Sequence, residues 1–268
     1  MAAPEFLINP AGRDAPTFVF AHGAGIGMDA PFMTTVAEGL AARGVQVARF
    51  EFAYMAQRRT GGAKRPPPKV ALLQEEYLAA LATLAESGPV VIGGKSMGGR
   101  VASLIADDLL AAGKIKGALC LGYPFHPQGK PESLRVAHLE ALLTPTLICH
   151  GTRDPFGTQE EVATYALSKQ VELAWFEDGD HDLKPRKRVT GLDHAAHLER
   201  LCKVAADWIK QVCAHELADA RDMLRGRCVA TQCADWRSAN ASSRVSQNPP
   251  FQANVSGAHD GSRDRKPR

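Results

Sequence analysis

Short apolar runs alternate with amphipathic stretches along most of this chain, and this alternation limits the possible folds more than any other feature. Six runs predict strands, and most are continuously apolar, as expected for strands that are buried on both faces of a sheet. These strands are Thr17–Ala21, Val45–Phe50, Pro89–Ile92, Ile115–Leu121, Thr146–Cys149 and Val171–Phe176. The remaining stretches predict helices, because apolar residues recur in them at spacings of three and four. The helices are Pro31–Ala42, Val70–Glu86, Gly98–Ala112, Ser133–Leu142, Thr158–Ser168 and Asp193–Cys213.

Repeated alternation of strands and helices with short connections predicts an α/β fold with a doubly wound, mostly parallel sheet of about six or seven strands. In such a sheet, ligands bind beyond the carboxyl ends of the strands. We therefore expect the functional residues in the loops that follow each strand.

Charge divides the chain into two parts. The 268 residues carry a formal net charge of +3, and residues 214–268 account for all of it, with nine Lys and Arg against six Asp and Glu. This segment is rich in Ser, Asn, Gln and Gly and has little apolar periodicity, so we expect it to be mostly disordered. Its Cys228 and Cys233 lack the further ligands that a metal site needs. The sequence predicts one α/β domain over residues 1–213 and a basic tail over residues 214–268.

Composition disfavours several classes of protein. The apolar content of 45% is too high for a disordered chain, and six cysteines are too few for a disulfide scaffold. No apolar run reaches the roughly 18 residues of a membrane span, and the N-terminus lacks the features of a secretory signal. We expect a cytoplasmic protein that binds neither a membrane nor, given its mild charge, nucleic acid.

The most informative motif follows the strand predicted at Pro89–Ile92. Residues 94–98 read Gly-Lys-Ser-Met-Gly and lead directly into a predicted helix. A Gly-x-Ser-x-Gly turn in this context holds its serine in a strained conformation, and the small flanking residues let strand and helix pack closely. The motif predicts that Ser96 is a nucleophile, with a purely structural turn as the alternative.

Gly-Lys-Ser also ends the phosphate-binding loop Gly-x-x-x-x-Gly-Lys-Ser. When Lys95 and Ser96 are aligned with that motif, its first glycine falls on Pro89, and the residues before Lys95 form an apolar strand. A phosphate cradle needs flexible backbone with free N–H donors there. Nucleotide binding is therefore disfavoured.

A serine nucleophile needs a base and a group that orients the base. Asp154 lies shortly after the strand predicted at Thr146–Cys149, and His181 lies shortly after the one at Val171–Phe176. Serine, acid and histidine then follow the chain order that is typical of parallel sheets of this type. We predict that Ser96, Asp154 and His181 form a catalytic triad.

A glycine-rich turn over residues 22–27 follows the first predicted strand. Backbone N–H groups in such a turn can stabilise an oxyanion, and we assign the two donors to Ala24 and Met97, the residue after the nucleophile. We expect His22 to order this loop rather than act as a base. His22 and Gly23 are also candidate substrate contacts.

Four segments together resemble a known family. They are Gly94–Arg100, Tyr123–Pro127, Gly151–Gly157 and Asp178–Lys187. As a set they are similar to a small alpha/beta-hydrolase group that contains bacterial predicted hydrolases and testis-expressed protein 30. More distantly they resemble the hydrolase-like domain of a regulatory subunit of the non-specific lethal histone acetyltransferase complex. The resemblance, over roughly residues 5–213, implies the α/β-hydrolase fold with Ser96, Asp154 and His181 as the triad, whereas the tail has no counterpart in the family.

The interval from Tyr123 to Leu143 has only 21 residues, too few for the helical lid that many such hydrolases carry. An open pocket suits small soluble acyl compounds better than long lipid chains. Tyr123, Phe125 and His126 leave a strand end near the site and are candidate substrate contacts, with packing of this Pro-rich turn as the alternative.

Cationic residues surround the motifs. Lys95, itself a candidate substrate contact, and Arg100 flank the nucleophile, and the others are Arg153, Lys184, Arg186, Lys187 and Arg188. They form either a positive rim that attracts an anionic substrate or an ordinary solvated surface. A further basic segment, residues 58–68, is expected to form a loop at the same edge of the sheet.

The sequence thus predicts a serine hydrolase of esterase or thioesterase type that cleaves small soluble acyl substrates through an acyl-enzyme, without a metal or organic cofactor. The alternative is a non-catalytic binding or assembly module on the same scaffold.

Overall fold

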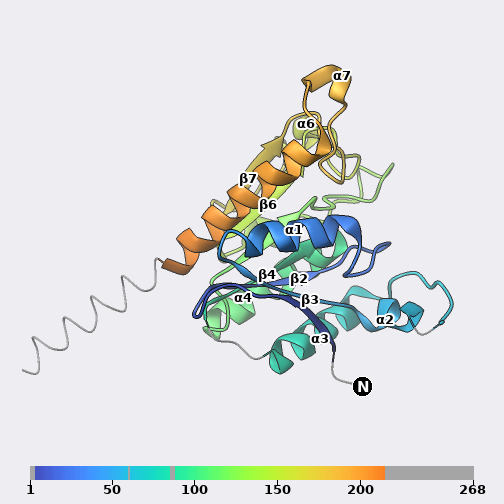
Figure 1. The fold of residues 1–268 in the computed structure, drawn as a ribbon. Helices are drawn as coiled ribbons and strands as arrows, with labels where there is room; N and C mark the ends of the chain where they lie inside the picture. Colours follow the sequence, from blue (N-terminus) through green and yellow to red (C-terminus); the bar gives the residue numbers. More distant parts are fainter. Residues whose placement is uncertain (1–3, 60, 85–87, 215–268) are drawn as a thin grey trace, which may run out of the picture. The chain divides into compact units, whose positions relative to one another are not determined.

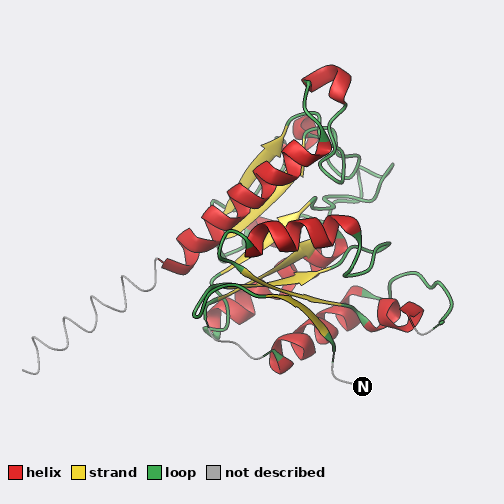
Figure 2. Ribbon diagram, viewed as in Figure 1, coloured by secondary structure: helices red, strands yellow, loops and turns green. Residues whose placement is uncertain are grey.

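The computed structural model describes residues 4–59, 61–84 and 88–214, which form a seven-stranded sheet with helices on both faces (Figures 1 and 2). The strands are β1 (Phe6–Asn9), β2 (Thr17–Ala21), β3 (Gln46–Phe50), β4 (Val90–Lys95), β5 (Gly117–Leu121), β6 (Thr146–Gly151) and β7 (Val171–Phe176). The helices are α1 (Pro31–Ala41), α2 (Ala53–Arg59), α3 (Val70–Thr83), α4 (Met97–Ala111), α5 (Ala137–Glu140), α6 (Gln159–Val162), α7 (Lys187–Thr190) and a further helix over residues 194–214.

The order of strands in the sheet is β1-β3-β2-β4-β5-β6-β7. Strand β1 runs antiparallel to β3, and all other neighbouring pairs are parallel. From β2 the chain moves outward to β3 and then returns to the other side of β2 to form β4. This change of direction places a crevice at the carboxyl ends of β2 and β4, which is where open α/β sheets bind ligands.

The strands are apolar because helices cover both of their faces. Along β2, Phe18 and Phe20 pack in one core cluster with residues of α1 and of the helix over residues 194–214, while Val19 packs in the other with residues of α3 and α4. Figure 1 shows α1 and α3 on opposite faces of the sheet. Alternate side chains of one strand therefore enter two separate cores, as the period of two in a strand requires.

The doubly wound, mostly parallel sheet that the sequence predicts is confirmed, with all six predicted strands within a few residues of their observed bounds. The prediction missed β1, a four-residue strand at the edge of the sheet, and α2, which takes Arg58 and Arg59 out of the predicted loop. It also made two helices too long, because only Ala137–Glu140 and Gln159–Val162 are helical where ten or more residues were expected. Between β5 and β6 the chain forms only α5 and loops, so the absence of a substantial lid there is confirmed.

Residues 215–268 lie outside the described residues, so the predictions of a disordered basic tail and of free thiols at Cys228 and Cys233 remain predictions. Within the described part of the chain, no helix combines the length and apolar character needed to cross a membrane.

Candidate active site

Ser96 occupies a strained turn between β4 and α4. Its φ is +51° and its ψ is −112°, a conformation that residues with a side chain rarely adopt. The glycines on either side are required by close packing, since a Cβ on Gly94 would lie 2.5 Å from the carbonyl carbon of Gly98, and one on Gly98 would lie 2.6 Å from the carbonyl oxygen of Ala21. The turn therefore presents the Ser96 hydroxyl above the carboxyl end of β4 while strand and helix stay in contact.

The structure brings the side chains of Ser96, His181 and Asp154 into one hydrogen-bonded chain. The Nε2 atom of His181 lies 2.8 Å from Oγ of Ser96, and Nδ1 of His181 lies 2.8 Å from Oδ2 of Asp154. Because a carboxylate can only accept, Nδ1 carries the proton and Nε2 is left free to accept the hydroxyl proton of Ser96. This is the arrangement that a serine nucleophile and its general base require.

Asp154 is fully buried behind His181. Burial by itself would raise the pKa of this carboxyl, but hydrogen bonds from the His181 ring and from the backbone N–H of Phe156, at 2.9 Å, outweigh it and lower the pKa below its ordinary value. Asp154 is therefore ionised at neutral pH and can hold the His181 ring in one tautomer.

His181 is held from several sides. The ring of Phe156 lies 4.3 Å from the imidazole, centroid to centroid. Behind it, Nζ of Lys95 donates to the backbone carbonyl of His181 at 2.8 Å and lies 3.2 Å from a carboxylate oxygen of Asp182. Burial lowers the pKa of Lys95, although Asp182 opposes this shift. Lys95, a predicted substrate contact, does not line the cleft, because its side chain is 3% exposed and is directed at the His181 loop.

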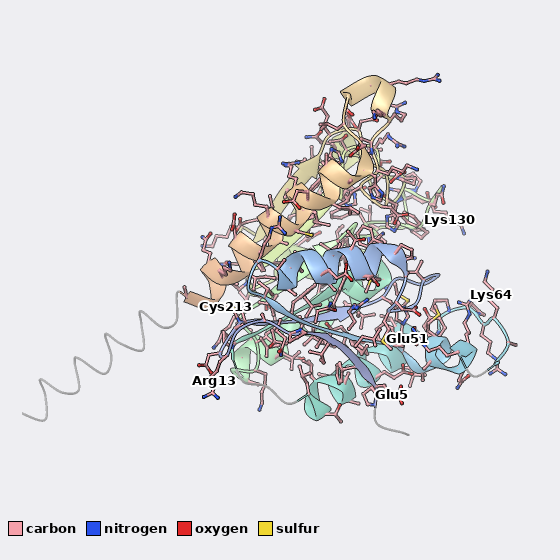
Figure 3. The ribbon with its side chains drawn as sticks, in the orientation of Figure 1. Glu5, Arg13, Glu51, Lys64, Lys130 and Cys213 are labelled. Carbon is pink, nitrogen blue, oxygen red and sulfur yellow. The ribbon has the colours of Figure 1, made fainter. Side chains whose placement is uncertain are left out.

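The loop that follows β2 is fixed by buried polar contacts. His22 accepts the backbone N–H of Phe52 at Nε2, at 3.1 Å, and donates from Nδ1 to the carbonyl of Gly23, at 2.7 Å. Burial lowers the pKa of His22, which keeps this tautomer neutral. Glu51, labelled in Figure 3, accepts the backbone N–H of Met28 at 3.0 Å and so ties down the far end of the loop. His22 and Gly23 were also predicted as candidate substrate contacts. Both are buried and neither lines the cleft, so their contacts fit the other prediction, that His22 orders the loop.

A cleft of about 300 Å³ opens beside Ser96. It is lined by Ala24, Pro67, Pro68, Val70, Leu73, Ser96, Met97, Arg100, Pro124, Arg135 and Phe156. The two residues predicted to stabilise an oxyanion, Ala24 and Met97, thus lie on the cleft together with the nucleophile. Arg135, Phe156 and the three prolines of the cleft were not among the predicted site residues. These prolines are Pro67, Pro68 and Pro124. The position of Phe156 two residues after Asp154 is a signal that could have found it.

Tyr123, Phe125 and His126, which were predicted as candidate substrate contacts, do not line the cleft. All three are at most 2% exposed. The Tyr123 hydroxyl donates to the carbonyl of Arg135 at 3.1 Å, and the Phe125 ring meets the buried His150 ring edge-on at a centroid distance of 5.1 Å. Packing of the Pro-rich turn, the alternative reading, describes them correctly.

Three of the seven cations in the predicted positive rim, Lys95, Arg153 and Arg186, meet carboxylates in the structure. Arg186 forms an ion pair with Asp178 and lowers the pKa of that carboxyl to about 2. Arg153 lies 3.5 Å from Asp178 and 3.7 Å from Asp180. These pairs hold the loop that carries His181. Of the predicted cations, Arg100 is the one that lines the cleft.

Comparisons with known proteins agree with this fold. A family model described as an alpha/beta hydrolase domain matches residues 14–210. Among solved structures, a serine hydrolase homologue from Coxiella burnetii is similar with a TM-score of 0.57 at 19% identity, covering 76% of this chain and 90% of its own. Est1E from Butyrivibrio proteoclasticus has a TM-score of 0.57 at 16% identity, covering 80% of this chain and 100% of its own. A serine hydrolase described as lacking a lid, from Xanthomonas campestris, has a TM-score of 0.56 at 16% identity, with coverages of 79% and 95%.

Proposed function

Because this chain belongs to the alpha/beta hydrolase family, we propose that it is a serine hydrolase of esterase or thioesterase type that cleaves small soluble acyl substrates. The observation that carries the proposal is the unbroken chain of hydrogen bonds from Ser96 through His181 to Asp154, with both distances at 2.8 Å. On its motifs, we also assign the chain to the small hydrolase group that contains testis-expressed protein 30.

In the acylation step, Oγ of Ser96 attacks the carbonyl carbon of the substrate while His181 takes the hydroxyl proton at Nε2. The electron pair of the carbonyl moves to its oxygen, and the backbone N–H groups of Ala24 and Met97, the two assigned donors, stabilise that charge. Each such donor typically speeds the reaction by about 10²- to 10³-fold. When the carbonyl reforms, the bond to the leaving group breaks, and His181 returns its proton to the departing oxygen or sulfur.

In the deacylation step, water attacks the acyl-enzyme, and His181 takes a proton from it. Collapse of the second intermediate breaks the bond to Oγ, releases the acid and returns the proton to Ser96. Asp154 stays ionised and keeps the proton of His181 on Nδ1 throughout.

The size of the cleft supports the substrate class. About 300 Å³ is at the lower end of the range for small-molecule sites, and the chain between β5 and β6 builds no helical cover over it. A long acyl chain would remain exposed to water, so we infer short acyl groups.

Labelling with a fluorophosphonate probe tests the proposal, because such probes react with activated serines and need no known substrate. Wild-type protein should be labelled, whereas Ser96→Ala should not be. His181→Ala should slow labelling by about 10²- to 10⁴-fold, the usual cost of losing a general base. Ser133→Ala, which removes an exposed serine outside the cleft, is the matched control and should be labelled like wild type. Folded wild-type protein that resists the probe would favour a non-catalytic module.

A further inference from the structure

Two arginines face the cleft beside the nucleophile. Arg100 lies one helical turn after Ser96, and its backbone N–H donates to the Ser96 carbonyl at 3.0 Å. Arg135 comes from the segment between β5 and α5, and its backbone is held at both ends: its N–H donates to Phe125 at 2.7 Å, and its carbonyl accepts from Tyr123 at 3.1 Å. The backbone positions of both residues are therefore set by the fold.

Neither guanidinium has an acidic partner among the described residues. Within residues 4–59, 61–84 and 88–214, no Asp or Glu forms an ion pair with Arg100 or Arg135, whereas Arg59, Arg153 and Arg186 each meet one. The Nε atom of Arg100 is also buried with no hydrogen-bond partner in this part of the chain. Buried polar groups without partners are rare, and at a cleft they point to a ligand.

The cations also act on their surroundings. Burial lowers the pKa of Arg135, and the charge of Arg100 lowers it further. Burial and then Arg100 likewise lower the pKa of the neighbouring His138 to about 4. The two arginines thus repel each other next to a neutral imidazole, and a bound anion would relieve that repulsion.

We propose that Arg100 and Arg135 bind a carboxylate of the substrate, so that the enzyme acts on esters or thioesters that carry an acid group close to the bond that is cleaved. This inference rests on the proposed function, because it concerns the same cleft. A guanidinium fork matches the two oxygens of a carboxylate, which a lysine does not. Ser96, Arg100 and Arg135 line the same small cleft, so we infer that the acid group lies only a few bonds from the reacting carbonyl. A glutarate-length acyl group is the probe chosen for such a short separation.

The test compares matched 4-nitrophenyl esters, the glutarate monoester against the neutral pentanoate. A second pair, 4-acetoxybenzoate and its methyl ester, places the acid on the leaving group. Wild type should prefer the acid in at least one pair by about 10- to 100-fold in kcat/KM at low salt, as expected for hydrogen bonds to a charged group. Arg100→Gln and Arg135→Gln should each remove most of that preference while changing the neutral ester much less. Arg135→Lys should restore only part of it, because lysine keeps the charge and loses the fork.

Arg13→Gln is the matched control. Arg13 precedes β2 at the amino ends of the parallel strands, and Figure 3 shows it on the side of the domain away from Lys64 and Lys130, which belong to the loops that contribute Pro67 and Arg135 to the cleft. This variant should keep the rates of wild type with all four esters. Free glutarate should also protect Ser96 from the fluorophosphonate probe in wild type and in Arg13→Gln, but not in the Arg100→Gln, Arg135→Gln double variant.

The outcomes separate the two proposals. If wild type neither reacts with the probe nor cleaves any ester, the proposed function fails and this inference with it. If Ser96-dependent cleavage occurs without a preference for the acid, or if the preference survives in both glutamine variants, the carboxylate site is refuted while the hydrolase stands.

Discussion

Replacing Gly122 by alanine should displace His181 and slow every reaction of Ser96. Gly122 follows β5 with a φ of +66°, and a Cβ there would lie 2.7 Å from the carbonyl oxygen of His181 and 3.4 Å from Nδ1 of its ring. That nitrogen makes the hydrogen bond to Asp154. One methyl group would therefore overlap the backbone carbonyl of the proposed base while it touches the ring.

The magnitude follows from these distances. The carbonyl of His181 would have to move by about 0.3 Å to reach 3.0 Å, below which such contacts essentially never occur, and by about 0.7 Å to reach the ordinary contact of 3.4 Å. A misplacement of about 1 Å at a catalytic group can cost about 10²-fold in rate, so we expect a loss of about 10- to 100-fold. The left-handed conformation adds about 1–2 kcal/mol of backbone strain for a residue with a Cβ.

Gly113→Ala provides a matched control, because Gly113 has a φ of +67° and a Cβ there would meet nothing within 4 Å. Gly113→Ala should lower the free energy of unfolding by about 1–2 kcal/mol through backbone strain alone, and Gly122→Ala should lower it by more, because its Cβ also overlaps the His181 carbonyl. Only Gly122→Ala should lower the second-order rate constant for fluorophosphonate labelling of Ser96. Equal labelling rates in the two variants would refute the claim that the methyl group acts through His181.

Three further changes test the framework around the site. Tyr77→Phe should lower the free energy of unfolding in urea by about 1–3 kcal/mol, because the buried N–H of Gly93 loses the Tyr77 hydroxyl as its acceptor. An unchanged midpoint of the urea unfolding curve would contradict this. Asp178→Asn should destabilise the protein only at a pH where the wild-type carboxylate is ionised. Hydrogen bonds from Arg186 lower the pKa of Asp178 from 3.8 to about 2, so its contribution to the free energy of unfolding is complete above pH 3.8 and is lost as the pH falls through 2. Acid unfolding curves of wild type and this variant should converge in that window rather than stay parallel. His138→Gln should reduce the pH dependence of stability between pH 6.5 and 4 by about one proton. Burial keeps His138 neutral in the folded state over this range, whereas the same side chain is protonated in the unfolded chain. An unaltered slope of stability against pH would contradict the lowered pKa of His138.

Much of the fold could be predicted because its signals are local. Apolar runs that are buried on both faces mark β2 to β6, and their alternation with helical periodicity leaves few arrangements other than a doubly wound sheet. Strand β1 has only four residues and no clear alternation, and it exists through antiparallel pairing with β3, about forty residues away. No local pattern could reveal it. The short helices α5 and α6 were predicted too long because their apolar residues serve tertiary packing rather than further helical turns.

The predicted triad depended on residue type, chain order and position after strands, and all three can be read along the chain. The turn at Ser96 could be recognised from Gly94 and Gly98, because the close packing at these two positions excludes any side chain. The hydrogen bonds to His181 and Asp154 join segments far apart in the sequence, and only the folded chain supplies their lengths.

The distribution of charge around the cleft could not be predicted from the sequence. Lys95, Arg153 and Arg186 look like free cations in the sequence, yet Asp182, Asp178 and Asp180 pair with them in the folded domain. Arg135 stands in no motif, yet folding brings it to the cleft beside Arg100. Chain order is enough to indicate strands, turns and the types of residue that a reaction needs. Burial and ion pairing depend on atoms contributed by distant segments, so the side chains that meet a substrate are settled only when the sheet and its loops come together.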